Sequence, residues 1–194
     1  QGPFRFKAKI IGEGANLGAT QLGRIDYALA GGRINTDFID NSAGVGCSDH
    51  EVNIKILLGD AVAQGKLTVT QRNKLLADMT DDVSALVLMD NYRQSMALTN
   101  AQHQSIALAD EHVRFMQTLE RSGDLDRVVE FLPDDENFEQ RLAMGKGLTR
   151  PELSVLLAYA KIFLFKDVLL SDLPDDPDLT GSLATYFPPL IQKK

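Results

Sequence analysis

Two glycine-rich segments near the start of the chain carry the residue types that could hold a ligand. Residues 12–20 read Gly-Glu-Gly-Ala-Asn-Leu-Gly-Ala-Thr, and residues 41–51 read Asn-Ser-Ala-Gly-Val-Gly-Cys-Ser-Asp-His-Glu. Each segment lies between an apolar, strand-like run and a helical pattern. A glycine-rich turn from strand to helix can present backbone N–H groups to an anion and lets a ligand approach the backbone closely. We therefore expect the first third of the chain to carry the chemistry and the rest to be built for packing.

The first segment has the glycine spacing Gly-x-Gly-x-x-x-Gly, whereas the dinucleotide-binding fingerprint places its last glycine one residue earlier. On spacing alone, a tight turn that binds nothing is as good an interpretation as a turn that binds a ligand. Asn16 adds a functional possibility. Its carboxamide could point at a ribose hydroxyl or at another carboxamide, although asparagine also tolerates left-handed backbone geometry in a turn.

The polar residues of the second segment also have structural explanations. Ser48 and Glu51 have the spacing of a capping box, so Ser48 is expected to begin a helix. Asn41 fits an ordinary turn residue. His50 could shuttle protons, but an exposed histidine near a helix start more often has no such role. Cys47 is expected to be a bystander, since only a helix N-terminus could activate it.

The elements around these segments follow from residue periodicity. Alternating apolar and basic residues over 4–10 predict a half-buried strand that leads into the first glycine turn. Thr20 is the expected N-cap of a helix that ends at the glycine pair 31–32. A second extended stretch is expected over residues 33–39, and a second helix from Ser48 to about Gln64. The predicted inward residues of the two helices are Leu22, Ile25 and Leu29, then Val52, Ile56 and Leu57.

From Lys66 onward the pattern is helical. Thr68 and Gln71 form a second capping box, and a helix restarts or continues at Thr80. Further helices are expected over residues 105–121, 124–132 and 134–144. The most apolar helix begins after Thr149 and runs to about Leu170, because a cap, an early proline and a carboxylate coincide there. Its predicted inward face is Leu153, Leu156, Leu157, Ile162 and Phe163. Residues 173–194 are proline-rich and expected to be partly irregular.

Composition limits the classes of function. The chain has 194 residues, 44% of them hydrophobic, with a net charge of −7 and an isoelectric point near 4.9. There is no basic stripe for nucleic acid, no apolar run long enough to span a membrane, and no signal peptide. The single cysteine excludes an internal disulfide and suits a reducing compartment, so we expect a cytoplasmic protein. His103 and His112 lack the spacing of a metal site, and no metal is expected. The chain does not begin with Met, which suggests a fragment of a longer protein.

Together the two segments resemble those of amino-acid dehydrogenases that act on glutamate. Glu-Gly-Ala-Asn at 13–16, followed by Thr20, is similar to that family's Glu-Gly-Ala-Asn-x-Pro-Thr-Thr. Residues 41–48 resemble its Asn-Ala-Gly-Gly-Val-x-x-Ser, and Glu51 matches the glutamate that follows. The whole of residues 12–58, and Leu-Thr-Arg-Pro-Glu-Leu-Ser at 148–154, are similar to the large bacterial NAD-specific glutamate dehydrogenases.

The resemblance implies oxidative deamination of L-glutamate to 2-oxoglutarate and ammonia, with NAD as the hydride acceptor. It places Asn16 at the nicotinamide-ribose end of NAD, supported by the backbone of Gly14 and Ala15. Asn41 should lie near the nicotinamide and the substrate, and Ser48 should bond a substrate carboxylate. Two stretches depart from the smaller enzymes: Leu-Gly-Ala at 17–19 replaces x-Pro-Thr, and Asp-His at 49–50 replaces aromatic or apolar residues.

The family also needs a lysine in a Gly-Gly-x-Lys setting and a proton-transferring aspartate. Lys7, Lys9 and Lys55 do not match that setting. We therefore expect no catalytic residue in this chain and no activity from it alone. The expected fold is an α/β remnant of a Rossmann-like cofactor domain over residues 1–65, followed by a mostly α-helical domain over residues 66–194. The full-length protein is expected to be a homo-oligomer.

Two other interpretations stay open at this point. The chain could be a helical interaction or assembly module with a vestigial glycine-rich start, or part of another amino-acid dehydrogenase, such as one for leucine or phenylalanine. An enzyme requires Asn16, Asn41 and Ser48 to converge on one cleft, whereas an assembly module does not. The long helical part argues against the leucine and phenylalanine enzymes.

Overall fold

A computed structural model describes residues 7–192, which group into two compact units. Of the described residues, the first unit comprises 7–41 and 94–163, and the second comprises 42–93 and 164–192. The strand predicted over residues 4–10 lies partly outside the described residues. Within them the prediction is wrong for residues 7–9, since the strand begins only at Ile10, and residues 7–10 are exposed. The domain boundary predicted after Gly65 stays a prediction.

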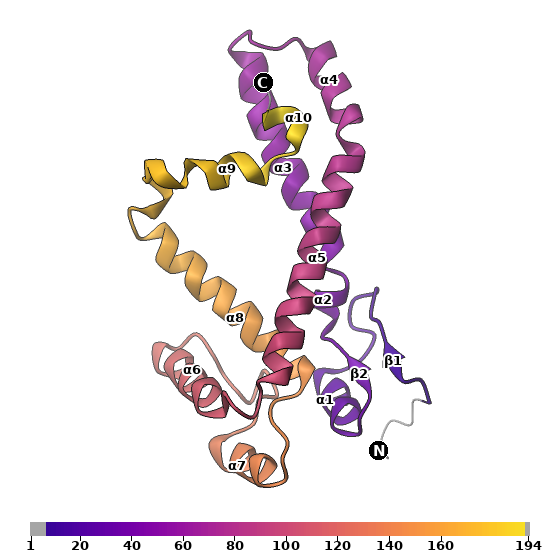
Figure 1. Ribbon diagram of the computed structural model, residues 1–194, viewed down its shortest axis with the longest axis vertical. Coiled ribbons are helices and arrows are strands. Elements are labelled where there is room, and N and C mark those ends of the chain that lie inside the picture. Colours follow the sequence, from indigo (N-terminus) through magenta and orange to yellow (C-terminus); the bar gives the residue numbers. More distant parts are fainter. Residues whose placement is uncertain (1–6, 193–194) are drawn as a thin grey trace. The chain divides into compact units, whose positions relative to one another are not determined.

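The first unit begins with a small β-α-β arrangement (Figure 1). Strand β1 (Ile10–Ile11) pairs in parallel with β2 (Arg33–Ile34), and α1 (Gln21–Leu29) connects them and packs beside β2. The hydroxyl of Thr20 accepts a hydrogen bond from the Gly23 N–H at 3.1 Å, which confirms the predicted N-cap. The prediction of an extended stretch over 33–39 is wrong beyond Ile34, because Asp37–Asp40 forms the short helix α2.

The glycine pair after α1 has two separate structural roles. Gly31 has φ +93°, a left-handed conformation that ends the helix at low cost only for glycine. A Cβ on Gly32 would lie 2.2 Å from the ring of Tyr27, so any larger residue at position 32 would clash with that ring. Tyr27 in turn donates its hydroxyl to the Ala8 carbonyl at 2.5 Å. The pair therefore lets α1 turn back tightly onto the strands. Within α1, Ile25 is buried as predicted, whereas Leu22 is exposed.

The rest of the first unit is helical. It contains the end of α5 (Thr80–His103), α6 (Ala109–Ser122), α7 (Asp135–Ala143) and the first part of α8 (Arg150–Leu169). One apolar core joins these elements: Ile39, Leu98, Ala109, Met116, Leu119, Leu125, Leu132, Phe138, Leu148, Leu153, Val155 and Leu156. Gly123 ends α6 with φ +77°, and Asp134 caps α7 by accepting from the Asn137 N–H at 2.7 Å.

The helix predicted over residues 105–121 is present as α6, but it begins four residues later, at Ala109. The helix predicted over residues 124–132 is wrong. Residues 124–132 form turns and no helix. There the Asp126 carboxylate accepts from the Val128 N–H at 2.9 Å, a side-chain bond that competes with helical bonding. Phe131 has φ +56°, which no α-helix accommodates.

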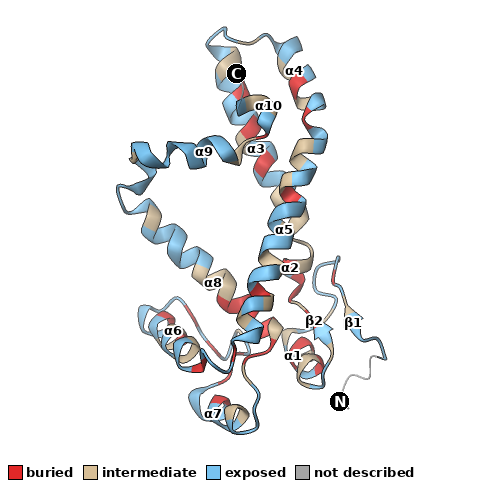
Figure 2. Ribbon diagram, viewed as in Figure 1, coloured by how far each residue is buried: buried red, intermediate tan, exposed pale blue. Residues whose placement is uncertain are grey.

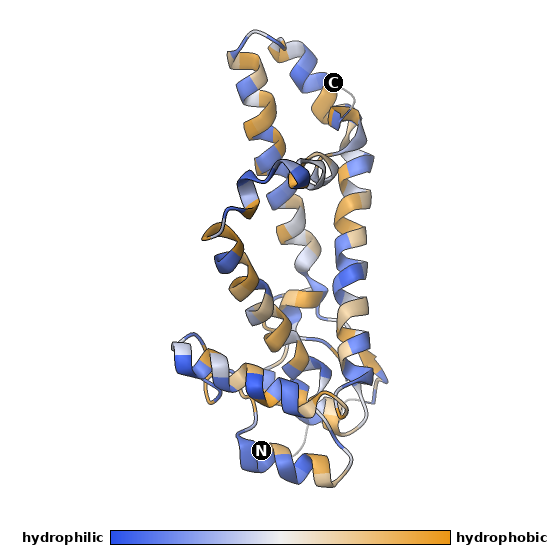
Figure 3. Ribbon diagram, turned by 60° about the vertical axis from the view of Figure 1, so that its left-hand side comes forward, coloured by the Kyte–Doolittle hydropathy of each residue, from blue (hydrophilic) through white to orange (hydrophobic). Residues whose placement is uncertain are grey.

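The start of α8 matches the predicted signal. Glu152 is fully buried and accepts bonds from the N–H and the hydroxyl of Thr149, both at 2.7 Å. Arg141 pairs with the same carboxylate at 2.7 Å, so its charge is compensated. Figure 2 shows the first turns of α8 buried and the later turns exposed, although Figure 3 shows it hydrophobic over much of its length. Leu153 and Leu156 are buried as predicted, but Ile162 and Phe163 are exposed and the prediction for them is wrong.

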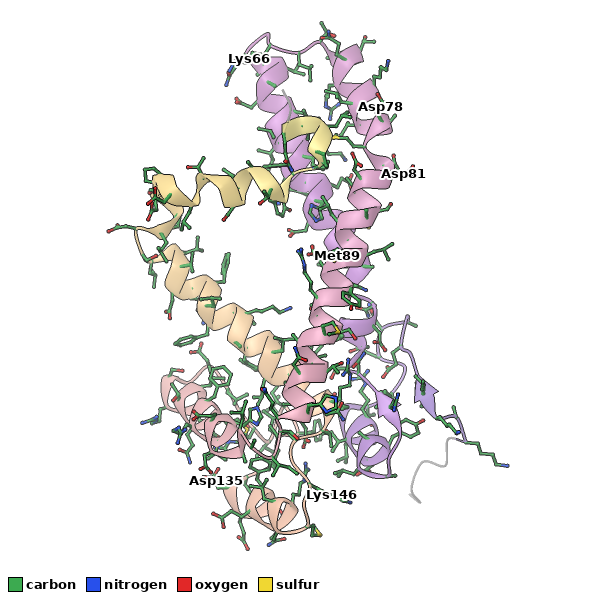
Figure 4. The ribbon with its side chains drawn as sticks, viewed as in Figure 1. Lys66, Asp78, Asp81, Met89, Asp135 and Lys146 are labelled. Carbon is green, nitrogen blue, oxygen red and sulfur yellow. The ribbon has the colours of Figure 1, made fainter. Side chains whose placement is uncertain are left out.

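The second unit contains α3 (Ser42–Ala63), α4 (Val69–Asp78), the first part of α5, α9 (Thr180–Tyr186) and α10 (Pro189–Gln192). The predicted Thr68–Gln71 capping box is present, with the Thr68 N–H bonded to Gln71 Oε1 at 2.9 Å. Figure 4 labels Asp78 and Asp81 at the junction of α4 and α5. The core consists of Ile54, Leu58, Leu75 and Met79, with Leu67, Leu76, Val83, Phe187, Leu190 and Ile191 packed against it. Short 3-10 turns lie at Leu173–Asp175 and Pro177–Leu179, so the C-terminal region is largely helical.

Helix α3 overturns the prediction of a second glycine turn. It begins at Ser42 and includes Gly44 and Gly46, so Ser48 lies inside the helix and is not its N-cap. The predicted inward face is also wrong, since Val52 and Ile56 are exposed while Ile54 and Leu58 are buried. Within residues 7–192 the fold is mostly helical, and β1 and β2 are the strands it contains. No helix in that range is both long enough and apolar enough to cross a membrane.

Candidate functional site

The loop over residues 12–20 is held by three carboxylates, which we call the carboxylate clamp: Glu13, Asp37 and Asp40. Three backbone N–H groups of the loop donate to them: Glu13 to Asp40 Oδ2 at 2.8 Å, Leu17 to Asp37 Oδ2 at 2.7 Å, and Ala19 to Glu13 Oε2 at 3.1 Å. The loop therefore uses these amides to bond its own protein. They are not free to bind an anion, contrary to the simplest expectation for a glycine-rich turn.

Glu13 is the centre of the clamp. It is 6% exposed and forms a two-pronged ion pair with Arg24 of α1, which is 3% exposed. Arg24 Nε lies 2.6 Å from Oε1 and Nη2 lies 2.7 Å from Oε2. The bond from Glu13 raises the pKa of Arg24 above its ordinary value, with a smaller contribution from Asp37. A Cβ on Gly18 would lie 3.1 Å from Glu13 Oε2, so this glycine gives the carboxylate room.

Asn16 and Asn41 meet through their side chains. The Asn41 carboxamide N–H donates to Asn16 Oδ1 across 25 positions of sequence. Gly14, Ala15 and Asn16 are exposed, and the space around Gly14 is open. The contact leaves the Asn16 NH₂ group as a donor and the Asn41 carbonyl as an acceptor at one place on the surface. The two glycine-rich segments are thus brought together at these residues. The left-handed residue of the loop is Leu17, with φ +58°, so Asn16 does not serve as the turn-former.

A second polar chain links the clamp to the helical part of the first unit. Asn35, just after β2, donates to Asp40 Oδ1 at 2.6 Å and accepts a bond from Arg150 Nε. Arg150, at the start of α8, also donates to Thr99 Oγ1 at 3.0 Å and to Ser95 Oγ at 3.0 Å on α5. Burial lowers the pKa of Arg150, and the charge of Asp40 acts in the opposite direction. The clamp is therefore anchored on α8 and α5.

A cavity of about 680 Å³ opens beside this polar chain, next to the ends of β1 and β2. Its lining residues are Ile10, Ile11, Gly12, Ala28, Gly32, Arg33, Ile34, Asn35, Asp40, Thr99, Gln102, His103 and Arg150. Gly14, Ala15, Asn16 and Asn41 do not line it. Asp40, which lines the cavity, directly precedes Asn41 in the chain.

Ser48 lies on the exposed surface of α3 in the second unit, where its hydroxyl donates to the Gly44 carbonyl at 3.3 Å. This is a weak bond back to the preceding turn, and it leaves the oxygen able to accept or donate elsewhere. The expectation that Ser48 shares a cleft with Asn16 and Asn41 remains a prediction. Cys47 is exposed.

Sequence reasoning misjudged His50 and missed the clamp. His50 is 5% exposed, stacks on Tyr186 with ring centroids 4.8 Å apart, and lies 3.7 Å from Asp90. The available signal for the clamp was its set of acidic residues within an otherwise apolar and glycine-rich stretch, with Arg24 as the basic residue between them. Within residues 7–192 no group of three or more His, Cys, Asp or Glu side chains is arranged to hold a metal ion.

Comparison with known proteins places these motifs in a family. The family described as "Bacterial NAD-glutamate dehydrogenase, catalytic domain" matches residues 3–101, about half of the chain. The chain belongs to this family. A second family, "Glutamate dehydrogenase, C-terminal", matches residues 145–194. The catalytic-domain match covers the carboxylate clamp and both asparagines, which favours an enzyme over a purely structural assembly module.

Similar proteins extend over nearly the whole chain. Proteins named NAD-specific glutamate dehydrogenase are 54% identical in Pseudomonas aeruginosa, over 97% of this chain, and 52% identical in Halomonas elongata, over 97%. The one in Mycobacterium tuberculosis is 43% identical over 98% of the chain. In each case the chain spans 12% of the relative's length. This bacterial NAD-glutamate dehydrogenase segment therefore corresponds to a small part of those proteins.

Proposed function

We propose that this segment belongs to an enzyme that oxidatively deaminates L-glutamate to 2-oxoglutarate and ammonia with NAD. Its share of the work is to hold the nicotinamide-ribose end of the cofactor with Gly14, Ala15, Asn16 and Asn41. Asn41 also faces the substrate, and Ser48 bonds a substrate carboxylate. The observation that carries the proposal is the bond between the Asn41 and Asn16 side chains, which joins both motifs at an exposed point.

The donors and the charge at this point fit that end of the dinucleotide. The asparagine pair offers one NH₂ donor and one carbonyl acceptor, the complement of ribose hydroxyls and of a nicotinamide carboxamide. The clamp contributes three carboxylates against the charges of Arg24 and Arg150, which leaves one negative charge in excess. An excess of negative charge disfavours a phosphate and favours a neutral or cationic group, such as the oxidised nicotinamide ring. NAD supplies hydride acceptance when bound, and this chain's residues orient it.

The local fold supports the same assignment. Parallel β1 and β2 joined by α1 have the connectivity of one β-α-β unit, and Asn16 and Asn41 follow β1 and β2 in the chain. Ligands of open α/β sheets bind outside the carboxyl ends of the strands. We infer that this unit is part of the remnant of a Rossmann-like cofactor domain expected over residues 1–65. The full-length enzyme is proposed to be a cytoplasmic homo-oligomer, for which the single, free Cys47 suits a reducing compartment.

The test replaces each asparagine in the full-length enzyme that contains this segment. Asn16→Ala and Asn41→Ala should each raise the KM for NAD by about 5- to 10-fold, as expected for the loss of one hydrogen bond. Asn100→Ala, an exposed asparagine on α5, is the matched control and should leave the KM unchanged. If both asparagine variants behave like the Asn100 control, these residues do not contact the cofactor.

A further inference from the structure

We propose that Glu13 is a positioning residue, which acts through the carboxylate clamp to aim Asn16 at the nicotinamide-ribose end of the cofactor. This inference rests on the proposed function. Glu13 itself lies beneath the loop and is buried, so it does not reach a ligand on the exposed side. Its action is through the backbone that carries Asn16.

Glu13 takes part in the bonds that hold both ends of the loop. Its own N–H donates to Asp40, which fixes the start of the loop, and its carboxylate accepts from the Ala19 N–H, which fixes the end. The same carboxylate holds both prongs of the Arg24 guanidinium on α1. Charge-assisted, two-pronged bonds between buried groups are the strongest and most directional of the polar contacts available to a protein. Asn16 therefore lies at the middle of a loop whose two ends are held by the side chains of Asp40 and Glu13.

The loop also holds backbone strain next to Asn16. Leu17 has φ +58° although its side chain is 83% exposed, so no packing compensates for the left-handed conformation. The Leu17 N–H donates to Asp37 Oδ2 at 2.7 Å, and Asp37 Oδ1 lies 3.4 Å from Arg24 Nη2. The clamp thus keeps a strained residue in place directly after Asn16. Strain that the surroundings maintain in an exposed loop is typical of a position where geometry serves binding.

Loosening the carboxylate clamp should affect only one half of the bound dinucleotide. The amides of Glu13, Leu17 and Ala19 are already bonded, and the carboxylates that accept them place negative charge under the loop, which disfavours a phosphate there. Its exposed groups are those around Asn16. Loosening the loop should therefore weaken contacts to the nicotinamide ribose and ring and spare contacts to the adenosine and phosphate half.

The experiment compares two ligands on the full-length enzyme by calorimetry: NAD, and ADP, which lacks the nicotinamide ribose and ring. Glu13→Gln keeps the size of the side chain but removes the charge that orders Arg24 and the loop. Its Kd for NAD should rise on the order of tenfold while its Kd for ADP stays within about twofold. Glu139→Gln, an exposed glutamate on α7, should change neither constant. Equal weakening of both ligands would mean a general structural role and would overturn the proposal, as would no change in either.

Two further variants keep the outcome decisive. Asp37→Asn, which loosens the Leu17 end of the loop, gives the same comparison if Glu13→Gln does not fold. Asn16→Ala, measured in parallel, separates the two hypotheses. If Asn16→Ala leaves NAD binding unchanged, the proposed cofactor site is wrong. If Asn16→Ala weakens NAD binding but the clamp variants do not do so selectively, the site stands and the positioning role of Glu13 is refuted.

Discussion

Replacing Ser48 by alanine should separate substrate binding from helix stability. Ser48 is exposed in the interior of α3, and its hydroxyl makes one bond of 3.3 Å to the Gly44 carbonyl. Alanine is the better helix former, so the free energy of unfolding should change by less than about 0.5 kcal/mol. A hydrogen bond from Ser48 to a substrate carboxylate would be worth roughly 1–3 kcal/mol, because the acceptor is charged. In the full-length enzyme, kcat/KM for glutamate should therefore fall by roughly 5- to 150-fold.

The assay for Ser48→Ala is the initial rate of NADH formation at varied glutamate and saturating NAD, with the KM for NAD expected to change little. Ser84→Ala is the matched control, because Ser84 is also exposed in a helix and donates to the carbonyl four residues earlier, at 3.0 Å from Thr80. The control should keep full activity. Unchanged glutamate kinetics in Ser48→Ala would refute a substrate contact.

Further predictions concern stability and completeness of the catalytic unit. Leu153→Ala removes a side chain that is 3% exposed and should lower the free energy of unfolding, measured by chemical denaturation, by about 2–5 kcal/mol. Leu164 lies on the same helix but is 64% exposed, so Leu164→Ala should lower it by less than about 1 kcal/mol. Gly32→Ala places a methyl group 2.2 Å from the Tyr27 ring and should cost about 1–3 kcal/mol or more. Burial lowers the pKa of His112 in the folded chain. As the pH falls, the unfolded chain therefore binds a proton at His112 before the folded chain does. The stability that the neutral His112 contributes is present above about pH 6.5 and is lost as the pH falls. Denaturation midpoints at about pH 7.5 and pH 5.5 should differ less in His112→Gln than in the native chain. The 194-residue chain alone should form no NADH from NAD and glutamate, in contrast to the full-length enzyme.

Local signals were enough to predict the starts of α1, α4, α7 and α8. Thr20, Thr68 and Asp134 cap their helices with side-chain bonds to nearby N–H groups, and Thr149 with Glu152 marks the start of α8. Such bonds depend on residues within one turn, so they can be recognised without knowing the tertiary structure.

The errors occurred where tertiary packing outweighed local preference. Each glycine in a helix lowers helix stability by about 1 kcal/mol relative to alanine. For this reason residues 44–46 were predicted to form a turn. In the structure a Cβ on Gly46 would lie 3.5 Å from Val87 Cγ1, so the glycine sits where α3 meets α5. Between Leu153 and Phe165 most side chains of α8 are apolar, so hydropathy could not single out the buried face. Ile162 and Phe163 were assigned to the core for that reason.

The candidate site was predictable only in part. The sequence motifs named Asn16 and Asn41 as candidates, and the structure adds that their side chains are bonded. Their contact with NAD stays a prediction. The clamp could not be predicted, because Glu13, Asp37 and Asp40 are spread over 28 positions and their pairing with loop amides depends on how α1 and α2 fold back on the loop. Side-chain bonds between distant segments have no periodic signature in the sequence.

The most direct test of the proposed function is a structure of the full-length enzyme with NAD bound. We predict that the carboxamide of Asn16 lies about 3 Å from a ribose hydroxyl or the carboxamide on the nicotinamide side, with Asn41 still bonded to Asn16. A complex in which Asn16 faces the adenosine half, or makes no contact with the cofactor, would contradict the assignment.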